Sequence, residues 1–118
     1  AEDGIRDSSV TGVQTVLFRS AGAGELSGPL VRPLALAAIA ATAGLRGAPP
    51  IIGGGGIGSP ADALDFFAAG ATLVSLGSAL WADANLPAAV GESARRAAAA
   101  RGHDTVAGLI GTALAPTR

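Results

Sequence analysis

The chain has 118 residues, of which 49% are hydrophobic and 14% charged, and its formal net charge is −1. This composition predicts one small globular domain rather than a disordered chain, and the absence of a basic cluster excludes a nucleic-acid-binding surface. The sequence has no cysteine, so disulfides, thiolate metal sites and cysteine nucleophiles are excluded, which fits a cytoplasmic protein.

The first twenty residues differ in character from the rest of the chain. They carry five charged side chains and show no sustained helical or strand periodicity. Residues 1–7 can be encoded by GCA GAA GAC GGC ATA CGA GAT, and residues 10–15 by GTG ACT GGA GTT CAG ACG, which resemble sequencing-adapter sequences. We therefore expect residues 1–20 to be a non-native segment and residues 21–118 to be the C-terminal part of a longer protein. The alternative is a polar, natural N-terminal arm.

Beyond this segment, glycine-rich loops, helices and short apolar runs alternate. Residues 21–30 form a glycine-rich loop, and the apolar spacing of residues 31–45 predicts a helix that ends near Gly44. The apolar run 48–53 predicts a short strand that is buried on both faces. The longest apolar stretch, 33–43, is too short to span a bilayer, so we expect a soluble protein with no membrane partner.

A second helix follows this strand. Ser59 is predicted to be its N-cap and Pro60 its first residue, while Asp62 places a carboxylate at the positive end of the helix dipole. Three side chains share one helical face and are expected to point toward the core: Leu64, Phe67 and Ala68.

Three further elements complete the pattern. The apolar run 71–78 predicts a second buried strand, and residues 86–102 and 104–115 predict two more helices. The order of loop, helix, strand, helix, strand, helix, helix indicates an α/β fold with parallel strands and crossover helices. Two parallel strands leave both sheet edges uncovered, which favours part of a larger sheet over a complete small domain.

Both predicted strands are followed at once by glycine-rich segments. Gly55 and Gly56 follow the first strand, and Gly77 and Ser78 follow the second. Because the carboxyl ends of parallel strands meet at one edge, we expect these backbone N–H groups, with the helix end near Ser59, to bind a phosphate. A Cβ would block the ligand, and such turns often need positive φ. The alternative is that these glycines only form tight turns.

No other residue is assigned a chemical role. His103 has no second histidine and no cysteine to complete a metal site, so no metal is expected. Trp81 is expected to pack between helices rather than against a ligand. Arg95 and Arg96 are expected to form a solvated helix face.

Three motifs, in order, resemble the C-terminal part of class 1 dihydroorotate dehydrogenases: GELSGPLVRPLAL, PPIIGGGGIGSPADALDFFAAGATLVSLGSALW and HDTVAGLIGTAL. The resemblance extends from Ala21 to about Leu114 and implies the C-terminal part of a (βα)8 TIM barrel. It implies that Gly28 lies in a loop against flavin mononucleotide (FMN), and that the phosphate of FMN is bound by Gly55, Gly56, Gly77 and Ser78.

Two positions depart from the family pattern. Ser78 replaces the usual threonine and keeps its hydroxyl group. Glu25 replaces the second glycine of G-G-L-S-G and brings a carboxylate near an anionic cofactor, which is unfavourable unless the side chain points to water.

The resemblance also implies an activity for the whole protein. The family oxidises dihydroorotate to orotate in pyrimidine biosynthesis: a base, which is a cysteine in class 1, removes a proton while a hydride passes to the flavin. That cysteine, a lysine and several asparagines lie upstream in family members. This chain has no cysteine or lysine, and its one asparagine is Asn85, so we expect no catalytic residue here.

The implied assembly is a homodimer, which can also pair with an iron–sulfur/FAD electron-transfer subunit. The stretches VRPLAL and LIGTAL resemble the NAD-linked branch in particular. Two alternatives remain open at this point. One is the C-terminal part of another FMN barrel, such as the flavin domain of dihydropyrimidine dehydrogenase, and the other is a non-catalytic phosphate-binding half-barrel module.

Overall fold

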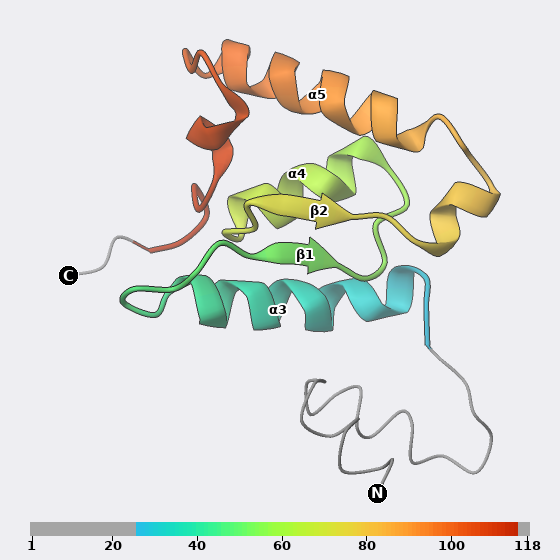
Figure 1. Cartoon of the computed structure of the whole chain (residues 1–118), viewed down its shortest axis with the longest axis horizontal. Coiled ribbons are helices and arrows are strands. Elements are labelled where there is room, and N and C mark those ends of the chain that lie inside the picture. The colour runs from blue at the N-terminus through green and yellow to red at the C-terminus, as the bar shows by residue number, and fades with distance from the viewer. Residues whose placement is uncertain (1–25, 116–118) are drawn as a thin grey trace, which may run out of the picture.

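The computed structural model describes residues 26–115, which form a two-stranded parallel sheet with helices packed beside it (Figure 1). In chain order the elements are the 3-10 helix η1 (Pro29–Val31), α3 (Arg32–Ala43), β1 (Ile52–Gly54), α4 (Pro60–Ala68), β2 (Leu73–Ser75), the 3-10 helix η2 (Ser78–Trp81), α5 (Leu86–Ala100) and the 3-10 helix η3 (Val106–Leu109). Within this range, no helix combines the length and the apolar character that crossing a bilayer requires.

The two strands pair in parallel, as the alternation of elements predicted. Gly53 lies opposite Val74, with one further pair on each side of them. Both arrows in Figure 1 point the same way, so the segments that follow β1 and β2 leave the sheet at the same end. The predicted α/β class with parallel strands is confirmed.

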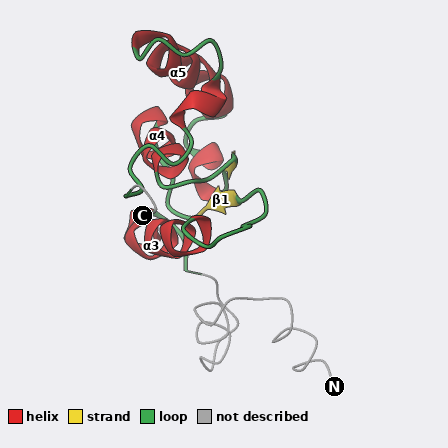
Figure 2. Ribbon diagram, turned by 90° about the vertical axis from the view of Figure 1, so that its left-hand side faces the viewer, coloured by secondary structure: helices red, strands yellow, loops and turns green. Residues whose placement is uncertain are grey.

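The prediction that both strands are buried on two faces is wrong for the described residues. Side chains alternate across a strand, and the helices cover the face that carries Gly53 and Val74. Ile52 and Leu73 pair on the opposite face and are 68% and 59% exposed. Figure 2 shows the strands beside the stack formed by α3, α4 and α5. One face of the sheet therefore has no covering layer among the described residues.

Gly53 is the point of closest packing between the sheet and the helices. A Cβ at this position would lie 2.8 Å from Ile39 Cδ1 and 2.9 Å from both Phe66 Cδ1 and Ala71 Cβ. The glycine lets α3 and α4 press their large side chains directly against the backbone of β1.

The buried face of α4 consists of Ala63, Phe66 and Phe67. The predicted core-facing residues were Leu64, Phe67 and Ala68, but Leu64 and Ala68 are only half-buried. The observed buried face is therefore offset from the predicted one by about one residue. The physical reason is that α4 packs on two sides at once. Phe66 contacts the core beneath β1, while Phe67 joins Ala94, Ala98 and Leu109 in a second cluster with α5 and η3.

The ends of α4 form as the sequence predicts. Ser59 Oγ accepts a hydrogen bond from the Asp62 N–H at 3.2 Å, and Pro60 is the first helical residue. At the other end Gly70 takes φ +113° and donates its N–H to Phe67 O. These two residues fix the length of the helix and hence the path of the chain into β2.

Ser59→Ala is expected to lower the free energy of unfolding by about 1 kcal/mol, because the Asp62 N–H loses its acceptor at the helix start. Ser59→Thr keeps the hydroxyl group and is expected to retain most of the stability. Urea unfolding followed by circular dichroism measures both. Equal losses in the two variants would show that the hydroxyl group is not the stabilising feature.

The C-terminal segment does not form the predicted helix over 104–115. It forms η3 and then turns. Gly108 lies against the His103 ring with no room for a Cβ, and Gly111 has φ +74°. The N–H groups of Gly111 and Ala113 donate to Phe67 O and Ala68 O at 2.9 and 3.0 Å, so these two amides bind the end of α4 rather than carbonyl groups of a continuing helix.

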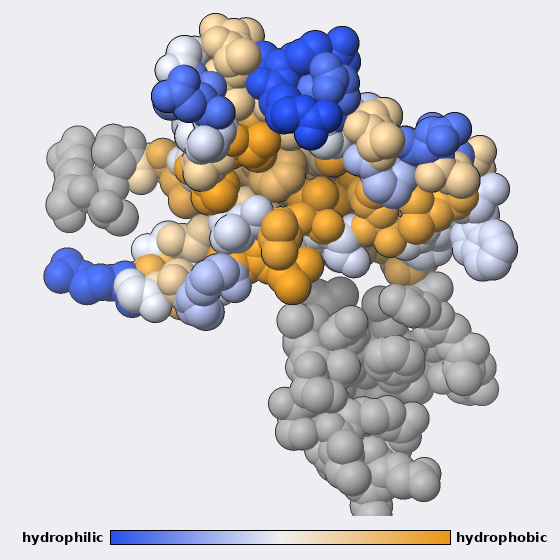
Figure 3. All heavy atoms as spheres, turned by 45° about the horizontal axis from the view of Figure 1, so that its top comes forward, coloured by the Kyte–Doolittle hydropathy of each residue, from blue (hydrophilic) through white to orange (hydrophobic). Residues whose placement is uncertain are grey.

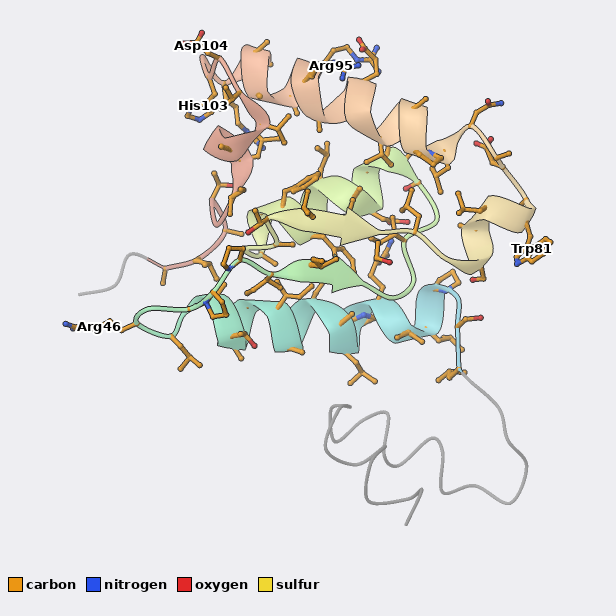
Figure 4. The ribbon with its side chains drawn as sticks, viewed as in Figure 1. Arg46, Trp81, Arg95, His103 and Asp104 are labelled. Atoms are coloured by element: carbon orange, nitrogen blue, oxygen red, sulfur yellow. The ribbon has the colours of Figure 1, made fainter. Side chains whose placement is uncertain are left out.

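Helix α5 matches its predicted range closely and has a solvated outer face. Figure 4 shows Arg95 pointing away from the sheet, and in Figure 3 hydrophilic residues gather at the top while apolar residues lie across the middle. Arg95 donates to Glu92 at 2.8 Å, and this hydrogen bond with its positive charge lowers the pKa of the Glu92 carboxyl. The expected role of Arg95 on a solvated face is confirmed.

Candidate anion-binding site

The glycine-rich segments after β1 and β2 border one open depression of about 1320 Å³. The 3-10 helix η1 and the start of α3 form its third side. All five residues that the sequence singled out line this depression: Gly28, Gly55, Gly56, Gly77 and Ser78. The structure therefore brings together residues that lie up to fifty positions apart in the sequence.

No described residue that lines the depression carries a charge. The wall consists of glycine backbone, the hydroxyl groups of three serines and apolar side chains, among them Val31, Leu34, Ile39 and Ile52. A bound anion would meet no carboxylate there, and no ammonium or guanidinium group either. Backbone N–H dipoles and the serine hydroxyl groups are available to attract it. Glu25, which the family comparison raised as a concern, lies outside the described residues.

Several N–H groups at the rim have no partner within residues 26–115. The amides of Gly56 and Gly77 donate to no backbone or side-chain acceptor there. Ser78 and Ala79 open η2, and the first N–H groups of a helix have no acceptor inside it. These donors come from both post-strand segments and border the same depression, which is the arrangement that favours an anion.

The glycines after β1 are required by contacts within the chain. Gly56 has φ +78°, and a Cβ there would lie 2.8 Å from both Gly28 O and Arg32 N. Gly55 has φ +114°, with Val31 Cγ1 3.2 Å from the Cβ position. The sequence-based reason, that a ligand excludes the side chain, is therefore incomplete, because close packing of two loops already excludes it.

Gly77 differs from these two glycines. Its φ is −123°, and a Cβ would meet no described atom within 4 Å. No contact among the described residues explains a glycine here. A ligand that approaches the backbone at this point would explain it.

The amino end of α4 is not open to an anion in the way the sequence indicated. Asp62 Oδ2 accepts the Gly58 N–H at 3.0 Å, and Ser59 Oγ takes the Asp62 N–H. The Asp62 carboxylate also pairs with the Arg32 guanidinium. The chain's own carboxylate thus lies at the positive end of this helix, whereas Gly56, Gly77 and the start of η2 carry amides without a partner within residues 26–115.

Sequence reasoning missed η2 and the Arg32–Asp62 pair. Four residues directly after Gly77 give too short a signal for helical periodicity, so η2 had no usable pattern. Arg32 and Asp62 each stand near the start of a predicted helix, but their separation in the sequence says nothing about contact.

Trp81 and His103 play no part in a buried site. The prediction that Trp81 packs between helices is wrong, since its side chain is 94% exposed and points away from the fold (Figure 4). It stands at the rim of the depression, on η2. His103 is exposed, and residues 26–115 hold no group of three potential metal-ligating side chains.

The sequence matches a family model over residues 5–94, and the model is that of dihydroorotate dehydrogenase. A relative from Trichlorobacter lovleyi, the catalytic subunit of dihydroorotate dehydrogenase B (NAD(+)), is 39% identical over 88 residues, or 75% of this chain and 29% of the relative. The subunit of the same name from Porphyromonas gingivalis is 52% identical over 54 residues, or 46% and 17%. A putative dihydroorotate dehydrogenase A (fumarate) from Solibacter usitatus is 37% identical over 93 residues, or 78% and 30%.

In these three comparisons the matched part covers 17–30% of the relative's length. The family match, by contrast, covers most of this chain and includes every lining residue of the depression. Two of the three motifs that carried the resemblance, GELSGPLVRPLAL and PPIIGGGGIGSPADALDFFAAGATLVSLGSALW, supply lining residues of the depression. The chain belongs to the dihydroorotate dehydrogenase family.

Proposed function

We propose that this chain supplies the phosphate-binding loops of an FMN-dependent dihydroorotate dehydrogenase, as the C-terminal part of a (βα)8 TIM barrel. One observation carries the proposal: in a chain of this family, five residues from three segments line a single uncharged depression at the carboxyl ends of two parallel strands. Ligand sites at that end of the strands are the rule in such barrels, and a phosphate site after the last two strands recurs among them.

The residues present fit a phosphate monoester. The amides of Gly56, Gly77 and Ser78, with the Ser78 hydroxyl, are the donors, while Gly28 and Gly55 let the loops approach each other. No carboxylate in the described lining opposes the charge. FMN bound here would supply the acceptor for the hydride that dihydroorotate loses on becoming orotate. This chain orients the phosphate end, and we assign it no catalytic residue.

The whole protein is proposed to act on dihydroorotate in pyrimidine biosynthesis in the cytoplasm. Two of the relatives described above bear the name of a catalytic subunit of the NAD(+) enzyme, which supports the NAD-linked branch and an iron–sulfur/FAD electron-transfer subunit as partner. A homodimer remains part of the same proposal.

Residues 1–20 are proposed to be non-native, on the strength of their adapter-like coding sequence. The family match extends from residue 5 into this segment, so the genomic sequence upstream of Ala21 is the deciding observation. An open reading frame that encodes the preceding strands of a barrel but not residues 1–20 supports the proposal. A genomic copy of residues 1–20 overturns it.

The proposal is tested by titrating the ¹⁵N-labelled chain with FMN and with riboflavin, which lacks the phosphate. FMN is expected to shift the amide signals of Gly56, Gly77 and Ser78 with a dissociation constant weaker than about 10 μM, because the isoalloxazine ring lacks most of its walls in this chain. Riboflavin is expected to leave these signals nearly unchanged.

Inorganic phosphate at matched ionic strength separates ring contacts from phosphate contacts. It is expected to move the same three amides as FMN. Equal shifts with FMN and riboflavin, or shifts confined to residues outside the depression, would contradict the phosphate assignment.

A further inference from the structure

A partly buried ion pair joins the segments that border the depression. Arg32, the first residue of α3, extends its guanidinium group to the Asp62 carboxylate on α4. The other carboxylate oxygen of Asp62 accepts the N–H of Gly58 at 3.0 Å. One carboxylate thus connects the start of α3, the start of α4 and the glycine segment between β1 and α4.

The backbone of Arg32 contacts the same glycine segment from the other side. The Cβ position of Gly56 lies 2.8 Å from Arg32 N and 2.9 Å from Arg32 Cβ. Gly28 O, which also lies 2.8 Å from that position, accepts the Val31 N–H at 3.1 Å. Residues 55–58 are therefore held between the Gly28 turn and the Arg32–Asp62 pair.

The pair is more buried than an ordinary surface ion pair. The side chains of Arg32 and Asp62 are 35% and 16% exposed, whereas those of Arg95 and Glu92 are 68% and 54% exposed. Exposed pairs contribute little because water screens them and because both side chains lose freedom. The Asp62 carboxylate is held further by the Gly58 N–H that its second oxygen accepts, and removal of either partner of the pair leaves a partly buried charge unpaired.

Neither member of the pair lines the depression. The Arg32 guanidinium group is paired with Asp62 and is therefore not available to a ligand in the depression. What the pair controls is the position of the amides at residues 55–58.

We infer that Arg32 and Asp62 are positioning residues that align the glycine segment after β1 with the Gly28 turn and so set the phosphate-binding amides in place before a ligand arrives. This inference rests on the proposed function. It extends that function by assigning the preorganisation of the site to two charged residues that do not touch the ligand.

The test uses Arg32→Gln and Asp62→Asn, which remove one charge each and keep similar side-chain volume. FMN and riboflavin are titrated into the ¹⁵N-labelled variants and the parent chain. Both variants are expected to bind FMN about ten-fold more weakly, with little change toward riboflavin, so the preference for the phosphorylated ligand falls. If the two residues had a purely structural role, the variants would bind FMN and riboflavin more weakly to the same extent.

Arg95→Gln is the matched control, because it removes an arginine from the exposed pair with Glu92 and is expected to leave the preference unchanged. Amide spectra report whether each variant folds. If Arg32→Gln or Asp62→Asn does not fold, Arg32→Lys retains the charge without the two-armed guanidinium and is expected to show a smaller loss of the same preference.

The outcomes separate the two proposals. A parent chain that does not prefer FMN to riboflavin overturns the proposed function. A parent chain that prefers FMN, with variants that keep the full preference, overturns the positioning role alone.

Discussion

Phe66→Ala is expected to lower the free energy of unfolding by about 3–5 kcal/mol, the largest effect expected of a single truncation among residues 26–115. Phe66 is fully buried and packs under Gly53, where β1 comes closest to α4. Small domains are stabilised by only about 5–15 kcal/mol in total, so the variant is expected to be largely unfolded in mild urea. Urea titration followed by circular dichroism measures the loss.

Leu45→Ala provides the control, because it removes apolar carbons from a side chain that is exposed after α3. It is expected to change the free energy of unfolding by no more than about 0.5 kcal/mol.

Leu64→Ala tests which face of α4 is buried. If Leu64→Ala lowers the free energy of unfolding as much as Phe66→Ala does, the observed buried face is contradicted and the face predicted from the sequence is favoured.

Gly56→Ala is expected to destabilise the chain by about 2–4 kcal/mol and to abolish the preference for FMN over riboflavin. An alanine at φ +78° is strained, and its Cβ would lie within 3 Å of Gly28 O and of Arg32 N. These are backbone atoms that cannot rotate away, so the Gly28 turn must move. Chemical denaturation and the two flavin titrations measure the two effects.

Two other glycines that line the depression are compared with Gly56. Gly58→Ala is expected to be nearly neutral, since the Cβ would meet only Asp62 Oδ2, at 3.7 Å. Gly77→Ala is expected to weaken FMN binding, because its Cβ would enter open space beside amides that have no partner within residues 26–115. If Gly77→Ala leaves FMN binding intact, no ligand approaches that backbone and the phosphate site is not where we propose it.

The elements that sequence reasoning identified correctly are those whose signal is local. Ser59, Pro60 and Asp62 specify the start of α4 through contacts within four residues, and α5 extends over fifteen residues of steady periodicity. The clustering of Gly55, Gly56, Gly77 and Ser78 was also predictable, because carboxyl ends of parallel strands meet whatever the details of packing, while their role in phosphate binding stays a prediction. All five predicted residues line the depression.

The errors arose where distant contacts overrode a local pattern. Residues 104–115 have a helical pattern, yet the N–H groups of Gly111 and Ala113 find acceptors at the end of α4. The buried face of α4 follows from having partners on two sides, which no single helical wheel reveals. Asp62 was correctly placed at a helix start, but its partner Arg32 lies thirty positions away on α3, and only the fold brings the two together.

The chain's one tryptophan, Trp81, is solvated in the folded protein while standing next to the segment that begins with Gly77 and Ser78. Its indole emission should therefore resemble that of a free peptide before and after denaturation. A flavin seated a few residues away would quench that emission by energy transfer. Fluorescence of the unmodified chain thus distinguishes occupancy from loss of structure, two events that a buried tryptophan would report as one.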